Sequence, residues 1–348
     1  MSVIDSSAKA YIILVNYNNP GDTIECLESL LKIDDHNYQV IVVDNSTEPC
    51  IATFKSWASG SFIPSKESAF PEYVLPIVSK PVDAFFIEEL AIPQLTQELE
   101  HQVIFIKAAQ NNGFAAANNI ALKYTLKFGS SASWAWILNN DTVVSHDILT
   151  AFRSYAASFS SPKIGIVGTK LFYYKHPEKL QGVAGVYNPY NGKTKHIGAF
   201  EEDKGQFDNF NYSTFNYVIG ASLFVSLPFV KEVGLMSEDY FLYYEEIDWI
   251  TRGLHNNWKS GFLSRGKVYH KEGASIDADV STKSDLADYY ICRNMLIFTI
   301  NNLPEYTFFI RASLLIRLFI RLVRLEFTRA KSVFRILFYK RTLKEKFQ

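Results

Sequence analysis

The feature that most constrains this chain is an apolar run that ends in two amides and a carboxylate, at residues 137–142 (ILNNDT). Residues 134–138 (WAWIL) are aromatic and branched, as in a buried β-strand. Polar residues directly after such a strand lie at the carboxyl edge of an open α/β sheet, where these folds bind ligands. Taken alone, the same residues also suit a turn or a helix N-cap, because Asn and Asp favour both.

Two further apolar runs end in the same way and enclose a helical pattern. Residues 11–15 (YIILV) stop at a polar turn, and residues 40–43 (VIVV) end at Asp44. The helix between them has an apolar face, formed by Ile24, Leu27, Leu30 and Leu31. Strand, helix and strand in this order form a parallel βαβ unit, which a strand at 103–106 extends. We therefore expect an α/β fold, with a mixed, mostly parallel sheet flanked by helices.

Eight short segments follow one another between about residues 10 and 300. They are NYN at 16–18, VDNS at 43–46, NNGFAAANN at 111–119, ILNNDT at 137–142, GAS at 220–222, the acidic segment 234–252, His270 and YYICRN at 289–294. In this order they resemble the GT-A glycosyltransferases of family 2, most closely the bacterial rhamnosyltransferase-like branch. The resemblance implies a Rossmann-like GT-A domain at 1–300 and inverting transfer of a sugar, rhamnose or a similar hexose, from a nucleoside-diphosphate sugar. The acceptor it implies is a glycan or a lipid-linked oligosaccharide in cell-surface polysaccharide synthesis.

The chemistry of such a transfer assigns a metal ligand. The departing diphosphate needs its charge neutralised, and a carboxylate flanked by amides suits a cation that takes its other ligands from water and phosphate. We expect Asp141 to hold Mg²⁺ or Mn²⁺, with Asn139 and Asn140 placing the diphosphate or the sugar. Asn139 departs from the Asp-x-Asp pattern common in the family, although this branch uses NND. The resemblance makes His270 a further ligand, which would favour Mn²⁺; a lone histidine at a strand end is otherwise more often only hydrogen-bonded.

The acceptor hydroxyl needs a base, and residues 243–248 (YYEEID) offer three carboxylates at the start of a predicted helix. Acids in the first turn also stabilise a helix dipole, so a purely structural helix start is the alternative. By resemblance to a Glu-Asp-x-Asp segment, Glu246 is the base. Glu245 and Asp248 would orient the helix or bind acceptor hydroxyls. We assign Gly220 and Ala221 to the acceptor side as well.

The resemblance also implies how the nucleotide binds. Tyr17, Asn18 and Asp44 would contact the base and ribose. The ribose and diphosphate would lie along Asn112, Gly113 and Asn118. Arg293 would contact the diphosphate or brace the acidic helix, and a structural ion pair is its alternative.

Charge and cysteine content bear on the setting of the protein. The 348 residues carry 35 Lys or Arg and 36 Asp or Glu, but residues 301–348 hold 11 of the basic residues and three of the acids. Cys26, Cys50 and Cys292 are too few and too scattered for a disulfide framework or a zinc site. No cleavable leader precedes Tyr11. We expect a reducing, cytoplasmic setting.

Residues 50–101 look like an insertion in the family's pattern, rich in proline and aromatic residues. Their apolar content favours a packed excursion, with a short helix through 85–90, over a disordered linker. The insertion either shapes the entry of the acceptor or is a surface elaboration.

The tail at 301–348 is expected to be a basic amphipathic helix. Its cationic stripe consists of Arg317, Arg321, Arg324, Thr328, Lys331 and Arg335. Leu, Ile and Phe on the other faces favour an anionic membrane surface over a nucleic acid as partner. This predicts a peripheral position on the inner face of the cell membrane. A partner helix, for example in a homodimer, is the alternative.

Two other classes of function fit an α/β fold of this kind. A sugar nucleotidyltransferase would need a basic, Gly-rich loop after the first strand, and residues 16–23 contain no Lys or Arg. A noncatalytic binding module would have no need of Asp141, Glu246 and His270.

Overall fold

The structure is a computed structural model that describes residues 8–62, 64, 67–159, 163–271 and 284–338. Its centre is a ten-stranded sheet with the order β3-β4-β2-β1-β5-β12-β7-β13-β6, in which β8 pairs with β7; β10-β9-β11 form a second sheet. The strands are β1 (Ala10–Asn16), β2 (Tyr38–Asp44), β3 (Ala84–Glu88), β4 (Val103–Lys107), β5 (Trp134–Asn139), β6 (Thr142–Val144), β7 (Ile164–Tyr173), β8 (His176–Gly182), β9 (Ala184–Tyr187), β10 (Thr194–Ile197), β11 (Asn216–Tyr217), β12 (Ser222–Ser226) and β13 (Lys259–His270). The helices are α1 (Pro20–Leu30), α2 (Ile51–Ser59), α3 (Pro71–Val74), η1 (Glu89–Gln94), α4 (Phe114–Phe128), α5 (Ile148–Ala157), α6 (Leu227–Val233), α7 (Glu245–His255), α8 (Asp285–Asn302), η3 (Pro304–Tyr306), α9 (Thr307–Val323) and α10 (Phe327–Phe338).

The central sheet is parallel on one side and mixed on the other. Each neighbouring pair from β3 through β4, β2 and β1 to β5 is parallel, whereas β12 runs antiparallel between β5 and β7. The chain passes from β1 to β2 on one side and later returns to β5 on the other. The carboxyl end of β1 is therefore a topological switch point, where α/β sheets bind ligands. The expected α/β fold with a largely parallel sheet flanked by helices is confirmed.

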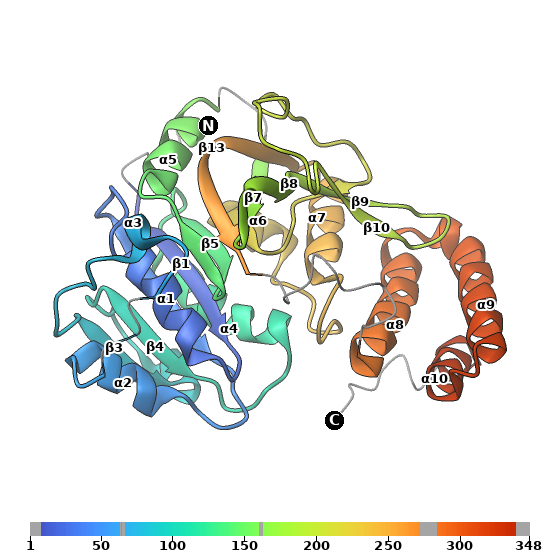
Figure 1. The fold of residues 1–348 in the computed structure, drawn as a ribbon, viewed down its shortest axis with the longest axis horizontal. Coiled ribbons are helices and arrows are strands. Elements are labelled where there is room, and N and C mark those ends of the chain that lie inside the picture. The colour runs from blue at the N-terminus through green and yellow to red at the C-terminus, as the bar shows by residue number, and fades with distance from the viewer. Residues whose placement is uncertain (1–7, 63, 65–66, 160–162, 272–283, 339–348) are drawn as a thin grey trace.

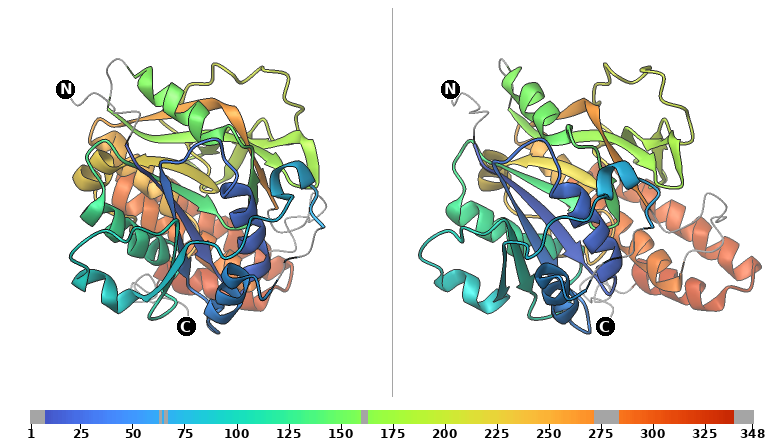
Figure 2. Two further views of the ribbon diagram at one scale, coloured as in Figure 1. Left: turned by 90° about the vertical axis from the view of Figure 1, so that its left-hand side faces the viewer. Right: turned by 60° about the vertical axis from the view of Figure 1, so that its left-hand side comes forward.

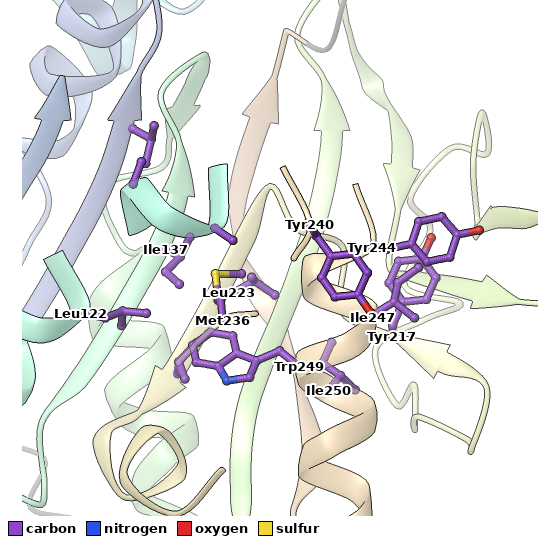
Figure 3. Close-up of a cluster of buried hydrophobic side chains, with 14 of the residues drawn as sticks. Leu122, Ile137, Tyr217, Leu223, Met236, Tyr240, Tyr244, Ile247, Trp249 and Ile250 are labelled. Carbon is purple, nitrogen blue, oxygen red and sulfur yellow. The ribbon is translucent and has the colours of Figure 1, made fainter. Parts of the chain in front are cut away.

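Alternate residues of each central strand supply two separate apolar layers. In β1, Ile12 and Leu14 pack on the side of α1, α2 and α5, and Ile13 and Val15 on the side of α4, α6 and α7 (Figure 1). Figure 3 shows the second layer around α7, where Trp249 lies among buried side chains of other elements. Because both faces are covered, polar side chains of the sheet gather at the ends of its strands.

The insertion at 50–101 is a packed part of the central fold. The short helix expected at 85–90 is wrong, because residues 84–88 form β3, which pairs in parallel with β4, and η1 follows. Aromatic and branched residues suit a strand, and the free edge of β4 satisfies its backbone groups. The ring of Phe105 in β4 stacks on Phe54 of α2 and on Phe86 of β3, with centroids 4.9 and 4.8 Å apart.

The tail forms two helices instead of the single helix with one basic stripe that its sequence suggests. α9 ends at Val323 and α10 begins at Phe327, and Leu325 between them has a left-handed backbone with φ 59°. The stripe is broken further because Arg321 is buried and donates to Asp288 of α8 at 2.6 Å. Figures 1 and 2 show α8, α9 and α10 grouped at one end of the molecule. Over the described ranges, no helix combines the length and the apolar character needed to cross a bilayer.

The aromatic stack at Phe105 yields a stability prediction. Phe105→Ala should lower the free energy of unfolding by about 3 to 5 kcal/mol, because the removed ring leaves a cavity between α2, β3 and β4. Leu90→Ala is the control, since Leu90 is 74% exposed and its loss should change stability by no more than about 0.5 kcal/mol. Urea denaturation measures both. Equal stabilities of the two variants would show that the insertion does not share the core.

Candidate active site

The carboxyl ends of three parallel strands lie side by side and are joined by hydrogen bonds. Asn16 of β1 is opposite Asp44 of β2, and β5 ends beside them at Asn139. The amide of Asn16 donates to Asp44 Oδ1 at 2.9 Å, and the hydroxyl of Thr23 donates to Asn16 Oδ1 at 2.9 Å. The amide of Asn140 in turn donates to Thr23 Oγ1 at 2.8 Å. This network fixes Asp44 and Asn140, both predicted site residues, in one polar edge.

β13 delivers His270 to the same edge, opposite Thr142 in its pairing with β6. His270 Nε2 lies 3.1 Å from Asp141 Oδ1, and the amide of Asn139 donates to the same nitrogen at 3.1 Å. His270 Nδ1 lies 3.0 Å from Gln181 Oε1. A carboxylate oxygen and an imidazole nitrogen as close as those of Asp141 and His270 attract a proton or another cation. Asp141 and His270 thus form a ready cation-binding pair.

The charges around Asp141 favour its ionised form. Burial by itself raises the pKa of the Asp141 carboxyl, but the imidazole of His270 and the ammonium of Lys271 outweigh it and hold the pKa below its usual value. Lys271 is itself fixed by Asp22 and Glu25 of α1. The site therefore keeps a carboxylate available as a ligand at neutral pH.

The donor set fits a divalent metal that is shared with a substrate. Within the described part of the chain, no cluster of three or more His, Cys, Asp or Glu side chains could hold an ion alone. Asp141 and His270 supply one oxygen and one nitrogen, a pair that suits Mn²⁺ better than Mg²⁺. Water and phosphate oxygens would complete the coordination, as they commonly do at sites that bind nucleotide diphosphates.

The proposed base is linked to this edge through the backbone before β12. A Cβ atom on Gly220 would lie 3.6 Å from Cγ and Cδ of Glu246, so the Glu246 side chain packs against the bare backbone there. The next carbonyl, that of Ala221, accepts from the backbone N–H of Asn139 at 3.0 Å. The structure thus brings together Glu246, Gly220, Ala221 and Asn139, as the sequence predicts.

The two glutamates at the start of α7 differ in environment. Burial raises the pKa of Glu246 to about 7, and burial together with the charge of Glu246 raises the pKa of Glu245 well above its usual value. Glu245 is buried, and its Oε2 has no hydrogen-bond partner among the described residues. Burial therefore favours the protonated form of Glu245. Glu246 titrates close to neutrality, as a general base should.

Asp248 is held by hydrogen bonds from three other side chains of the protein. Its carboxylate accepts from the hydroxyl of Tyr240 at 3.2 Å, from Arg252 Nε at 2.7 Å and from the amide of Asn302 at 2.8 Å. It is buried on the side of α7 that faces α8. Of the two roles predicted for Asp248, these contacts favour orientation of α7 over contact with an acceptor.

The turn before α7 is strained. Tyr243 and Tyr244 have left-handed backbones with φ 69° and 78°, a conformation that costs a non-glycine residue on the order of 1 to 3 kcal/mol. Tyr244 is buried, and its hydroxyl donates to the carbonyl of Gly192 at 3.0 Å. Figure 3 shows its ring packed beside Ile247 and Tyr217. The turn sets the position at which α7 begins, and therefore the position of Glu246.

Two adjacent residues of α8 hold this turn from behind. The amide of Asn294 donates to the carbonyls of Leu242 and Tyr243 at 2.8 and 2.9 Å. The guanidinium of Arg293 donates to the carbonyl of Asp239 and to Asn294 Oδ1, at 2.9 and 2.7 Å. Arg293 is buried, so these contacts favour the bracing role predicted for it over contact with a diphosphate.

The segment 111–119 meets the same turn from the other side. Gly113 has φ 95°, and a Cβ atom there would lie 2.3 Å from the carbonyl oxygen of Phe241. Gly113 therefore allows two parts of the chain to approach each other closely. Asn112 is partly exposed beside it. Asn118 donates to the carbonyl of Phe114 at 3.0 Å, and its buried Oδ1 has no partner among the described residues.

The remaining predicted nucleotide contacts lie in the loop after β1. Tyr17 is exposed, and Asn18 has a left-handed backbone with φ 54°. The N–H of Asn18 donates to Ser46 Oγ at 2.8 Å, and this hydroxyl donates to Asp44 Oδ1 at 2.7 Å. An exposed aromatic ring next to a buried carboxylate can stack on a nucleobase while the carboxylate orients a sugar hydroxyl.

Several site residues have no distinctive signal in the sequence. Thr23 and Gln181 are single polar residues, and they lie 117 and 89 residues along the chain from their partners Asn140 and His270. Asn16 lies in the NYN segment and Lys271 directly follows His270, so the neighbouring predicted residues could have pointed to both.

No protein-family model matches the chain, and no curated protein matches it in sequence. Among solved structures, it is similar to residues 1–349 of TarS from S. aureus, with 12% identity, a TM-score of 0.47 and coverage of 96% of this chain and 73% of that one. It is also similar to the mannosyltransferase PcManGT from Pyrobaculum calidifontis, in complex with GDP-Man and Mn²⁺, with 12% identity, a TM-score of 0.49 and coverage of 94% and 74%. TarS 1–349 in complex with UDP-GlcNAc matches with 12% identity, a TM-score of 0.47 and coverage of 88% and 71%. The functional conclusion therefore depends on the residues of the sheet edge.

The bracing of the turn by α8 can be tested with Asn294→Asp. The variant keeps the size of the side chain but cannot donate to the two carbonyls, so Glu246 should lose its fixed position. We expect a reaction that uses Glu246 to slow by up to about 100-fold, while ligands that contact only the ends of β1, β2 and β5 bind unchanged. Steady-state kinetics and calorimetric titration measure the two effects.

Asn301→Asp is the matched control for this variant, because Asn301 is exposed on the same helix. It should react at the wild-type rate. A wild-type rate in Asn294→Asp, with an unchanged circular dichroism spectrum, would show that the turn does not need this brace.

Proposed function

We propose that this protein is a metal-dependent, inverting glycosyltransferase. It would move a sugar, rhamnose or a similar hexose, from a nucleoside-diphosphate sugar to a glycan or lipid-linked oligosaccharide in cell-surface polysaccharide synthesis. The observations that carry the proposal are the pairing of Asp141 with His270 at the switch-point edge of the sheet and the packing of Glu246 against Gly220, whose neighbour Ala221 accepts from the backbone of Asn139. The resemblance of the eight sequence segments to family 2 GT-A enzymes supports the same function.

The donor would be held at the ends of β1, β2 and β5. Tyr17 and Asp44 would bind the nucleoside, and the amides of Asn139 and Asn140 would orient the diphosphate or the sugar. Asp141 and His270 would hold the metal, which when bound neutralises the charge that develops on the leaving diphosphate. His270 is buried, and burial lowers the local dielectric, so its interactions are stronger than in water.

Glu246 would remove the proton of the acceptor hydroxyl. As that oxygen bonds to the anomeric carbon, the bond from this carbon to the diphosphate oxygen breaks, and the proton moves to Glu246. Attack from the face opposite to the leaving group inverts the anomeric configuration. Burial, which raises the pKa of Glu245, would disfavour a second negative charge beside the base.

A panel of donors tests the proposal. The protein should release nucleoside diphosphate from one of dTDP-rhamnose, UDP-hexoses, UDP-galactofuranose or GDP-sugars when Mn²⁺ or Mg²⁺ and acceptor glycans are present. Glu246→Gln should reduce this rate by roughly 10² to 10⁴ with nearly unchanged donor affinity, because it removes only the base. Glu245→Gln, which makes the same substitution at the neighbouring position, is the matched control.

The relative rates of Glu245→Gln and Glu246→Gln decide which glutamate is the base. If Glu245→Gln is the slow variant and Glu246→Gln transfers normally, Glu246 is not the base. If none of the donors is turned over or bound, the proposed function itself fails.

The raised pKa of Glu246 predicts the pH dependence. A base acts in its deprotonated form, so kcat/KM should rise with pH through the pKa of Glu246, about 7, and level off above it. A carboxylate with the usual glutamate pKa would already be fully active at about pH 6. A kcat/KM profile that is flat from about pH 5.5 to 8 would contradict the assignment, because the base would then titrate elsewhere.

A further inference from the structure

The outward side of α9 carries an exposed stripe of apolar side chains. Phe308, Leu315, Phe319 and Val323 follow one another at intervals of seven, four and four residues and lie on one stripe of the helix. Phe308, Phe319 and Val323 are 76%, 67% and 66% exposed. Further exposed apolar side chains flank the stripe; they are Phe309, Ile316, Ile320 and Leu322. Figure 1 shows α9 as the outermost element at this end of the molecule.

Two of the three cations of α9, Arg317 and Arg321, face the protein. Arg321 is buried, and its Nη2 donates to Asp288 of α8 at 2.6 Å and contacts Cys292 Sγ at 3.5 Å. Arg317 lies on the same side and is half-buried. Ile310 and Leu314 also pack inward, so α9 carries apolar side chains on its outward side in addition to those that join the core. An apolar face of this size on the outside indicates an interaction surface.

The turn and α10 continue this surface. Leu325 is exposed in the turn, and the exposed side of α10 combines aromatic and basic side chains. These are Phe327, Lys331, Phe334, Arg335 and Phe338. Residues 307–338 contain seven Lys or Arg and one acid, Glu326. The outer face of the hairpin is therefore apolar with a basic rim.

We propose that the α9–α10 hairpin docks on an anionic lipid bilayer, with its apolar stripe at the boundary of headgroups and acyl chains. Anionic headgroups complement the basic rim. A symmetric contact between two copies would instead bring together like charges, Arg311, Arg324, Lys331 and Arg335 from each, with Glu326 as the one nearby acid. The charge of the surface thus selects lipid over a second copy.

The docking surface is directly connected to the candidate active site. α8 packs against both α9 and α10, and it also carries Arg293 and Asn294, which hold the turn before Glu246. A bilayer bound to the hairpin would therefore have a fixed relation to the acceptor side of the site. Docking itself does not depend on the proposed sugar transfer.

Sedimentation of the full chain with vesicles tests the proposal. The protein should bind vesicles of phosphatidylcholine with phosphatidylglycerol more tightly than vesicles of phosphatidylcholine alone. The combined variant Leu315→Ser, Phe319→Ser and Val323→Ser should bind at least about 100-fold more weakly, because three apolar side chains no longer leave water. Phe62→Ser, Leu90→Ser and Phe200→Ser, at exposed positions elsewhere, form the matched control and should bind as the wild type does.

A second variant tests the basic rim. Arg324→Gln, Lys331→Gln and Arg335→Gln together should weaken binding to the anionic vesicles by roughly 100-fold at low salt and leave binding to neutral vesicles unchanged. Arg321 is left intact because it is buried against Asp288.

Two outcomes would overturn the proposal. The first is a full chain that ignores anionic vesicles at low salt and sediments in solution as a dimer, which the apolar-stripe variant turns into monomers. The second is equal vesicle binding by the apolar-stripe variant, the rim variant and the wild type. If the apolar-stripe variant does not fold, judged by its circular dichroism, the rim variant decides between lipid docking and its failure.

Discussion

The left-handed backbone of Tyr243 and Tyr244, directly before α7, is the constraint on which the rest of the site depends. Their strain costs on the order of 1 to 3 kcal/mol each, more than the roughly 0.5 to 1.5 kcal/mol that a single hydrogen bond contributes. Two bonds from Asn294, one from the hydroxyl of Tyr244 and the burial of its ring are together of comparable size. The turn is therefore stable only because contacts from α8 and from the apolar core around α7 hold it together. The turn thereby places Glu246, which belongs to helix α7, at the edge of the sheet.

The carboxyl groups at this edge have pKa values that are shifted in opposite directions. The imidazole of His270 and the ammonium of Lys271 keep Asp141 ionised, which suits a metal ligand. Burial at the start of α7 favours the protonated forms of Glu245 and Glu246, which leaves Glu246 poised near neutral pH. Groups of one chemical type thereby take different tasks, because their surroundings separate their pKa values.

Much of this arrangement follows from the sequence, since parallel strands end at one edge wherever they lie in the chain. The positions of Asp44 and Asn139 beside Asn16 are predictable in that sense, whereas the joint roles of Asp141 and His270 and the role of Glu246 are expected only from the family resemblance. Thr23 and Gln181 are not predictable, because their partners are set by tertiary contacts. The strand at β3 escapes prediction because a short apolar run fits a helix or a strand until a neighbouring edge is known. In the tail, periodicity gives the two faces of α9, but the inward position of Arg321 depends on a tertiary contact, its hydrogen bond to Asp288 of α8.

The most direct test of the central claim is a crystal structure of the protein with Mn²⁺ and a nucleoside diphosphate, UDP, GDP or dTDP, measured for anomalous scattering. The account predicts a manganese peak bonded to Asp141 and His270, with the diphosphate completing its coordination and the nucleoside over the end of β1. A nucleotide bound elsewhere, or manganese bound away from this pair, would contradict it.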